Sequence, residues 1–178
     1  IIVGYPVSYG EHFIPPEPEE YKPTLKDAIW DLRKNAKPAL RKNKANPKLK
    51  IPNHEYMIGS FSTMYMSRNR VRSWDEPSFT IQAGGRHAPC HPQAPKMVKV
   101  KKDKMKFKHG STKLYRRLSV RECARIQTFP DSHIFNYESV PDGYKMIGNA
   151  VAVDFAAKIA AKIRDDLKRL GNMPVDFN

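Results

Sequence analysis

Hydrophobic and polar positions along the chain predict one long helix at the end and shorter elements before it. From residue 155 to residue 170, apolar side chains recur at spacings of three and four, which is typical of an amphipathic helix. Basic residues crowd its far end, as the helix dipole favours, and Gly171 is the expected C-cap. Residues 1–5 form an apolar run, and we expect a buried strand there.

Two shorter helices are predicted from their capping residues. Thr24 is placed to cap a helix that has Asp27 in its first turn. Ser119 and Glu122 have the spacing of a capping box, in which the hydroxyl accepts an amide hydrogen bond and the carboxylate reaches back. We expect the helix after Ser119 to run for about nine residues and to stop before Pro130.

The middle of the chain reads as short strands separated by long loops. Residues 64–66, 79–82 and 97–100 have strand-like sequences. Four prolines make residues 15–23 an extended linker, and residues 41–50 form a basic surface loop. Together with the predicted helices, this pattern indicates an α+β fold.

The balance of charge indicates a class of partner. The 178 residues include 32 Lys and Arg against 18 acids, which gives a formal net charge of +14 and a pI near 9.8. A surplus of this size favours a polyanion, with nucleic acid ahead of an anionic membrane. No stretch approaches the roughly 18 apolar residues of a spanning helix, and the start carries no secretory signal. Two cysteines far apart in sequence fit a reducing cytoplasm.

A row of arginines in residues 67–72 is the first candidate for chemistry. Alternate residues of an extended segment point to one side, so Arg68, Arg70 and Arg72 are expected to form one row. A planar guanidinium donates two parallel hydrogen bonds, which suits O6 and N7 of guanine in the major groove. The competing interpretation is a solvated basic strand, or contacts to phosphates alone.

Two segments that contain glycine give further candidates. Gly84 and Gly85 directly precede Arg86, so either the backbone approaches a ligand there, or the segment is an ordinary turn. Asn149 follows Gly148 just before the last predicted helix. There it either caps the free amides of that helix or helps to bind a polar ligand.

The two cysteines are expected to be structural. The sequence Pro89-Cys90-His91, with His87 nearby, offers too few ligands for structural zinc, and we expect no metal site. Cys123 falls on the inner face of a predicted helix and is expected to lie in the core.

Two longer segments resemble conserved blocks of the DNA (cytosine-5) methyltransferases. Residues 115–131, Tyr-Arg-Arg-Leu-Ser-Val-Arg-Glu-Cys-Ala-Arg-Ile-Gln-Thr-Phe-Pro-Asp, resemble the ninth block, and residues 144–151, Tyr-Lys-Met-Ile-Gly-Asn-Ala-Val, resemble the tenth. Their order and spacing also match. The opening strand resembles the end of the eighth block, and residues 79–82 resemble the Thr-hydrophobic signature of the variable target-recognition region. The resemblance covers nearly the whole chain.

The resemblance implies a division of the chain between two domains. Residues 1–14 would form the last strand region of an α/β domain that binds S-adenosyl-L-methionine, and residues 15–23 would be a linker. Residues 24–130 would form the small target-recognition domain, including the ninth-block helix. Residues 131–178 would return to the catalytic domain through the tenth block and the C-terminal helix, where Asn149, Ala150 and Val151 match positions that complete the cofactor site.

The recognition region also resembles the branch of the family that methylates the inner cytosine of GGCC. The likeness lies in residues 65–72 and 91–95. It implies that Arg68, Arg70 and Arg86 contact guanines, and that Met64 inserts where a base has been displaced. The expected DNA-binding residues are Met64, Arg68, Arg70, Arg72, Thr80 and Arg86.

The chemistry that the resemblance implies needs more than this chain. The family extrudes a cytosine from the duplex and attacks C6 with a cysteine thiolate, and S-adenosyl-L-methionine supplies the methyl group to C5. The nucleophile belongs to a Pro-Cys-Gln signature in the N-terminal half, which does not occur here. A cytoplasmic bacterial restriction–modification methyltransferase is therefore expected, in which this C-terminal part is inactive alone.

The expected partners are double-stranded DNA and an N-terminal catalytic half, which either belongs to the same enzyme or is a separate subunit. The first residue, Ile1, is not the Met of a natural start, which favours a piece of a larger protein. Two alternatives stay open, a DNA-binding module that no longer supports methylation and one subunit of a split methyltransferase.

Overall fold

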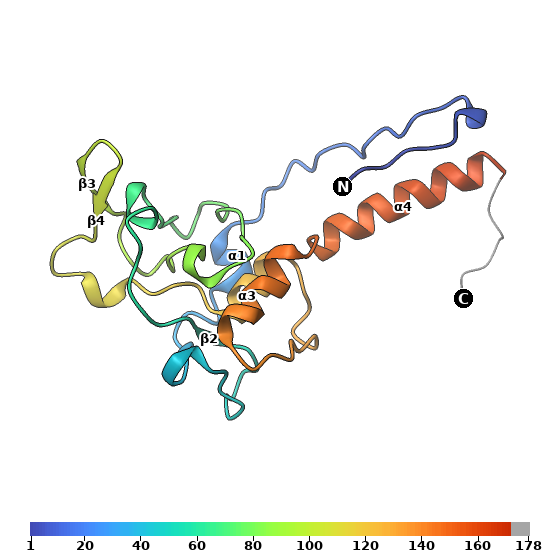
Figure 1. Ribbon diagram of the computed structural model, residues 1–178. Helices are drawn as coiled ribbons and strands as arrows, with labels where there is room; N and C mark the ends of the chain where they lie inside the picture. The colour runs from blue at the N-terminus through green and yellow to red at the C-terminus, as the bar shows by residue number, and fades with distance from the viewer. Residues whose placement is uncertain (172–178) are drawn as a thin grey trace. The chain divides into compact units, whose positions relative to one another are not determined.

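The computed structural model describes residues 1–171 and divides the chain into two compact units (Figure 1). The large unit comprises Lys22–Val151, and the small unit comprises Ile1–Tyr21 with the segment from Ala152 onward. Residues 131–151 belong to the large unit, because Phe135, Val140 and Ile147 are buried in its core. That the chain returns to a catalytic domain after residue 130 stays a prediction.

Helices α1 (Leu25–Ile29) and α2 (Val120–Ile126) of the large unit begin where their capping boxes predicted. The Ser119 hydroxyl accepts the Glu122 amide, and the Glu122 carboxylate accepts the Ser119 amide at 2.7 Å. Thr24 forms the equivalent pair of contacts at the start of α1. Helix α2 has seven residues and is shorter than the expected nine, since a turn replaces its last residues.

Helix α3 (Val140–Asn149) was not predicted, because a proline and two glycines within it argue against a helix. Pro141 is tolerated because it lies in the first turn, where its missing amide costs no hydrogen bond. Gly143 and Gly148 lie where other parts of the unit come too close for a side chain. Their helix-breaking tendency is therefore offset by packing.

The strands of the large unit are few and short, in agreement with the predicted α+β fold of short strands and long loops. Strand β1 (Lys37–Pro38) pairs in parallel with β2 (Glu55–Tyr56), and β3 (Val98–Lys101) pairs antiparallel with β4 (Lys104–Lys106). The strand predicted at residues 97–100 is confirmed within one residue.

The other two strand predictions were wrong. Residues 65–67 form a 3-10 helix, η3 (Tyr65–Ser67), and residues 79–82 are irregular. The single turn of η3 directs the Tyr65 side chain into the interior, where its hydroxyl donates to Ala88 O at 2.9 Å. A short apolar run fits either geometry, and the buried partner decides between them. The remaining 3-10 helices are η1 (Val7–Tyr9), η2 (Arg41–Asn43), η4 (Gly85–His87) and η5 (Thr112–Leu114).

Two hydrophobic clusters hold the large unit together. The main core brings α1, α2 and α3 together (Figure 1). A second cluster, which we call the hairpin core, supports β3 and β4. Its buried members are Tyr65, Val71, Cys90, Ala94, Met97 and Tyr115, with Phe61, Met66, Met105 and Phe107 packed against them.

In the small unit, the predicted C-terminal helix is confirmed as α4 (Val153–Arg169), and Gly171 follows it with a left-handed φ of +72°. Asn149 does not cap this helix, because α4 begins after Ala152. Residues 1–5 form no strand, and the Ile2 side chain is fully exposed. A strand needs a hydrogen-bonded neighbour, and none lies beside this segment within residues 1–171. No helix in the part of the chain described here has the length and apolarity needed to cross a bilayer.

Candidate nucleic-acid interface

A small hollow of about 160 Å³ brings together two of the predicted arginines and the predicted threonine. Arg68 and Arg70 come from the segment after η3, and Thr80 comes from the loop between Ser78 and Ile81. The Arg68 backbone is extended, with φ −142° and ψ 165°, and its side chain is exposed. The other lining residues are Asn69, Phe79, Gln82, His87 and Pro89.

Arg70 is held in place by the backbone of η3. Its Nε donates to Tyr65 O at 2.8 Å, and Nη2 donates to Met64 O at 3.2 Å. The guanidinium also lies 4.8 Å from the centre of the Tyr65 ring. These contacts fix the plane of the guanidinium before any ligand arrives, which lowers the entropic cost of using its remaining donors.

Arg72 does not join the other two arginines at the hollow. Its Nη1 lies 3.0 Å from the Glu76 carboxylate, and its guanidinium covers the Phe79 ring at 4.3 Å. The alternation of an extended segment predicted Arg72 in one row with Arg68 and Arg70, but Glu76 and Phe79 hold its side chain away from the hollow.

Met64 and Arg86 are both exposed and lie outside the lining of the hollow. Met64 is 69% exposed at the start of η3, and Arg86 lies within η4. The glycine before Arg86 has a packing role, because a Cβ on Gly85 would lie 2.7 Å from Met57 Sδ and 2.8 Å from the Tyr144 ring. Packing in the interior therefore requires a glycine at position 85, whereas a Cβ on Gly84 would meet nothing within 4 Å.

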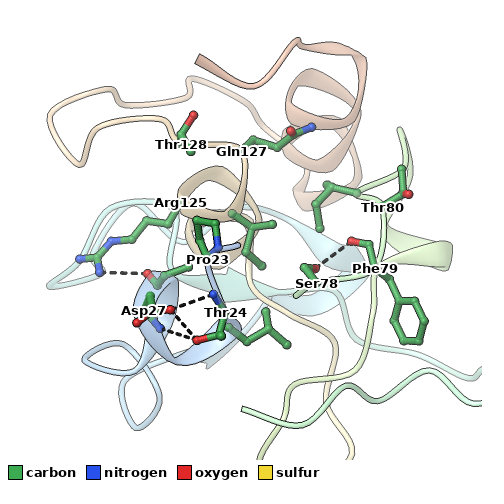
Figure 2. Close-up of a pocket in the computed structure, with 13 residues that line it drawn as sticks. Pro23, Thr24, Asp27, Ser78, Phe79, Thr80, Arg125, Gln127 and Thr128 are labelled. Atoms are coloured by element: carbon green, nitrogen blue, oxygen red, sulfur yellow. Dashed lines mark hydrogen bonds between the residues drawn. The ribbon is translucent and has the colours of Figure 1, made fainter. Parts of the chain in front are cut away.

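Thr80 also borders a second, larger hollow of about 510 Å³ (Figure 2). The start of α1 and the end of α2 form its other sides, and Thr24, Arg125 and Thr128 are among the residues that line it. Arg125 donates to Asp31 at 2.7 Å and to Asp131 at 2.6 Å. Its charge is thereby neutralised by acids, so this hollow is less suited to anions than the one at Arg68.

The loop that carries Thr80 and Arg86 rests directly on helix α3. A Cβ built on Gly148 would lie 2.3 Å from the Ala83 amide nitrogen and 2.3 Å from the Gln82 carbonyl carbon. No side chain fits into this space. Gly148 therefore sets how closely the tenth-block helix approaches the loop.

Asn149, Ala150 and Val151 follow at the end of α3. The side chains of Asn149 and Val151 are exposed, and Ala150 is partly buried. The Ala150 amide donates to Ile147 O at 3.1 Å. An exposed carboxamide beside an exposed apolar side chain suits a ligand that has both polar and apolar parts.

Neither cysteine is placed to act as a nucleophile. Cys90 is 1% exposed, and its Sγ lies 3.2 Å from the Tyr65 hydroxyl. Burial raises the pKa of the Cys90 thiol. Cys123 is fully buried, as expected for a core residue, and burial raises the pKa of its thiol as well. The reactive form of cysteine is the thiolate, so both groups are inert at neutral pH. No group of three or more metal-ligating side chains occurs among residues 1–171.

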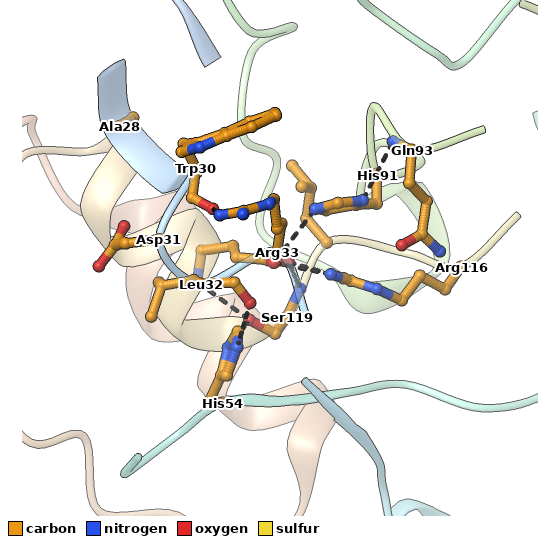
Figure 3. Close-up of polar contacts among 12 residues, drawn as sticks. Ala28, Trp30, Asp31, Leu32, Arg33, His54, His91, Gln93, Arg116 and Ser119 are labelled. Carbon is orange, nitrogen blue, oxygen red and sulfur yellow. Dashed lines mark hydrogen bonds and ion pairs between the residues drawn. The ribbon is translucent and has the colours of Figure 1, made fainter. Parts of the chain in front are cut away.

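A buried polar cluster centres on Glu122. Figure 3 shows the side chains of His54, His91, Arg116 and Ser119 that belong to it. The Arg116 guanidinium donates to both Glu122 oxygens, at 2.7 Å and 2.8 Å, in a bidentate pair. Because of Arg116, the pKa of Glu122 is lowered even though burial alone would raise it. Sequence reasoning found the capping role of Glu122 but missed this pair, since nothing in the spacing of the two residues indicates it.

His91 and His54 complete the polar cluster in neutral form. The Gln93 amide donates to His91 Nδ1 at 3.1 Å, so the proton of the neutral ring lies on Nε2, 3.4 Å from Glu122. Burial lowers the pKa of His91 to about 4, which outweighs the opposing effect of Glu122. Burial also lowers the pKa of His54, whose ring bonds the Ser119 hydroxyl at 2.8 Å.

This cluster predicts a loss of stability on mild acidification. An unfolded histidine takes up a proton near pH 6.5, whereas His91 in the fold does so only near pH 4. Between these values the unfolded state binds more protons, so stability falls as the pH is lowered. From pH 7.5 to pH 5.0 we expect His91 to account for a loss of about 2 kcal/mol, measured by urea unfolding. An unchanged pH slope in His91→Asn would contradict this origin.

The sequence profile of the C-5 cytosine-specific DNA methylase family matches residues 1–165. The chain belongs to this family. The chain is 62% identical over 172 residues to the type II methyltransferase M.MthTI of Methanothermobacter thermautotrophicus, covering 96% of this chain and 52% of that protein. It is 56% identical to M.FnuDI of Fusobacterium nucleatum, covering 85% and 44%, and 55% identical to M.NgoPII of Neisseria gonorrhoeae, covering 83% and 43%. The chain thus spans about half the length of these curated relatives.

Proposed function

We propose that this chain supplies target recognition to a type II DNA (cytosine-5) methyltransferase of a restriction–modification system. The observation that carries the proposal is the hollow that joins Arg68, Arg70 and Thr80, within a chain of the cytosine-5 methylase family. Two guanidinium groups at one concave site, on a protein of net charge +14, suit the guanine edges and phosphates of duplex DNA.

The proposed target is GGCC or a site that contains it. Arg68 is exposed, and its side chain makes no ion pair within residues 1–171, so its donor fork is available to O6 and N7 of a guanine. Arg70, already fixed by Tyr65 and Met64, would read a neighbouring guanine with its remaining donors. Arg86 and Met64 are both exposed, as the proposed roles in guanine contact and base displacement require.

The same proposal divides the chemistry between two parts of the enzyme. S-adenosyl-L-methionine would supply the methyl group, and Asn149 with Val151 would contact it from the end of α3. Their exposed carboxamide and apolar side chains fit such a role. The nucleophilic cysteine would come from the catalytic half, since the thiols of Cys90 and Cys123 are buried. The partners of this chain would therefore be that half and double-stranded DNA.

The direct test of recognition is the Arg68→Ala variant on two duplexes. We expect a loss of about 1–3 kcal/mol in binding to a GGCC duplex, because two hydrogen bonds to guanine are removed. Binding to a duplex with the four bases scrambled should change little. Fluorescence anisotropy titrations at one fixed salt concentration measure both affinities.

Arg41→Ala is the matched control, since Arg41 is an exposed arginine of η2 that does not line the hollow. It removes the same charge and should affect the two duplexes equally and slightly. Equal losses on both duplexes for Arg68→Ala would show contact with phosphates only, and the guanine-reading proposal would then be wrong.

A further inference from the structure

The β3–β4 hairpin carries a dense and one-sided charge. Residues 97–113 contain seven lysines, and Asp103 at the turn is the sole acid among them. Figure 1 shows the hairpin projecting at the edge of the large unit, away from α1 and α3. Every residue of β3 is exposed, and so are both lysines of β4.

The pairing of the two strands places three lysines on one face. Lys101 lies directly opposite Lys104, and Lys106 is two residues further along β4, so all three side chains point to the same side. We call these three residues the lysine face. Met105 lies between the two lysines of β4 and points to the other side.

The opposite face fixes the hairpin to the hairpin core. Met105 and Phe107 pack against that cluster, and the Phe107 ring stacks on Tyr115 with centroids 4.2 Å apart. The Phe107 ring also meets Phe61 edge-on at 5.1 Å. The same cluster contains Tyr65, whose carbonyl holds Arg70. The lysine face is therefore carried by the same buried cluster that supports the proposed base-reading site.

The charges of the lysine face are not compensated by the protein. Within residues 1–171, no acidic side chain lies within ion-pair distance of Lys101, Lys104 or Lys106. Two like charges directly opposite each other destabilise a strand pair. The repulsion between Lys101 and Lys104 therefore lowers the stability of the free protein. A polyanion that lies across both strands would neutralise these charges and remove the repulsion.

We infer that the lysine face is a second DNA-binding surface, which neutralises backbone phosphates of duplex DNA outside the recognition site without reading sequence. This inference rests on the proposed function. It assigns to the hairpin a share of affinity and of salt dependence, whereas Arg68 and Arg70 supply discrimination between bases.

The test replaces Lys101, Lys104 and Lys106 together with glutamine in the 178-residue chain. None of the three lysines belongs to the hairpin core, so we expect the glutamine variant to keep its fold. Far-ultraviolet circular dichroism of the variant checks this. Binding to a 30-base-pair GGCC duplex and to its scrambled version is measured across a series of salt concentrations. We expect both affinities to fall by the same factor, at least about 10-fold at 0.1 M salt, and the log–log salt slope to decrease by roughly 2.7.

The matched control replaces Lys37, Lys48 and Lys50 with glutamine, which removes an equal charge from exposed positions elsewhere on the large unit. Equal losses in the two triple variants would overturn the inference, since they would report net charge only. A loss confined to the GGCC duplex would also overturn it.

Lysines on an exposed strand edge also discourage aggregation. If the triple glutamine variant aggregates but its monomeric fraction binds DNA like the wild type, the lysine face serves to prevent aggregation, and the inference is wrong. If the wild type itself binds neither duplex, the proposed function fails. If the wild type binds and the glutamine triple is unchanged, the inference about the hairpin alone fails.

Discussion

Replacing Gly148 with alanine is expected to destabilise the large unit by roughly 2–3 kcal/mol and to abolish tight DNA binding. The added Cβ would lie 2.3 Å from backbone atoms of Gln82 and Ala83. Backbone cannot rotate aside as a flexible side chain does, so either α3 or the loop must move. Alanine is the better helix former by up to about 1 kcal/mol, and this gain is smaller than the cost of the overlap.

DNA binding is affected because the loop that contains Gln82 and Ala83 also carries residues of the proposed recognition site. Thr80 and Gln82 line the hollow beside Arg68, and Arg86 follows in η4. A displacement of about 1 Å at Gln82 changes the positions of all three relative to the arginines of the other segment. Urea unfolding measures the stability, and anisotropy titration with a GGCC duplex measures the binding.

Gly84→Ala is the control for this prediction. Gly84 lies in the same loop with an extended φ of 179°, and a Cβ there meets nothing within 4 Å. Its effect on stability should stay within about 0.5 kcal/mol. If Gly148→Ala were as stable as Gly84→Ala and bound DNA equally well, α3 would not rest on the loop as described.

Replacing Glu122 with glutamine is expected to destabilise the large unit by about 3–5 kcal/mol. Glu122 is fully buried and accepts both hydrogen bonds of the Arg116 fork as well as the Ser119 amide. A carboxamide has nearly the same shape, but one acceptor becomes a donor that faces other donors. The Arg116 charge, whose side chain is only 9% exposed, is then left without a counter-charge.

The exposed pair between Arg125 and Asp131 provides the comparison. Asp131 also accepts two hydrogen bonds from an arginine, but its side chain is 57% exposed. Water replaces the lost partner there, so Asp131→Asn should cost no more than about 1 kcal/mol. Chemical unfolding of the two variants gives both values. Similar losses at the two positions would mean that burial does not amplify the Glu122 pair.

The sequence by itself determined those features whose cause lies within a few residues along the chain. Thr24 and Ser119 predicted the starts of α1 and α2, because each cap bonds an amide three residues away. The apolar spacing over residues 155–170 predicted α4, because residues three and four apart lie on one face of a helix. The resemblance of residues 115–131 and 144–151 to conserved blocks predicted the family, which the profile match confirmed.

The tertiary structure alone decided which of the predicted site residues meet. The sequence placed Arg68, Arg70 and Arg72 in one row, but only two of them reach the hollow, because Glu76 and Phe79 hold the third. The Arg116–Glu122 pair and its two neutral histidines had no signature, since their environment is created by distant segments.

Helix α3 shows the physical reason most clearly. Local propensity counts Pro141, Gly143 and Gly148 against a helix, and that rule is correct for an isolated peptide. In the fold, Gly148 is required by backbone that lies more than sixty residues earlier in the chain, and Gly143 is required by the Tyr137 ring. Contacts between residues far apart in sequence outweighed local preference there, and the same contacts position the loop on which recognition is proposed to depend.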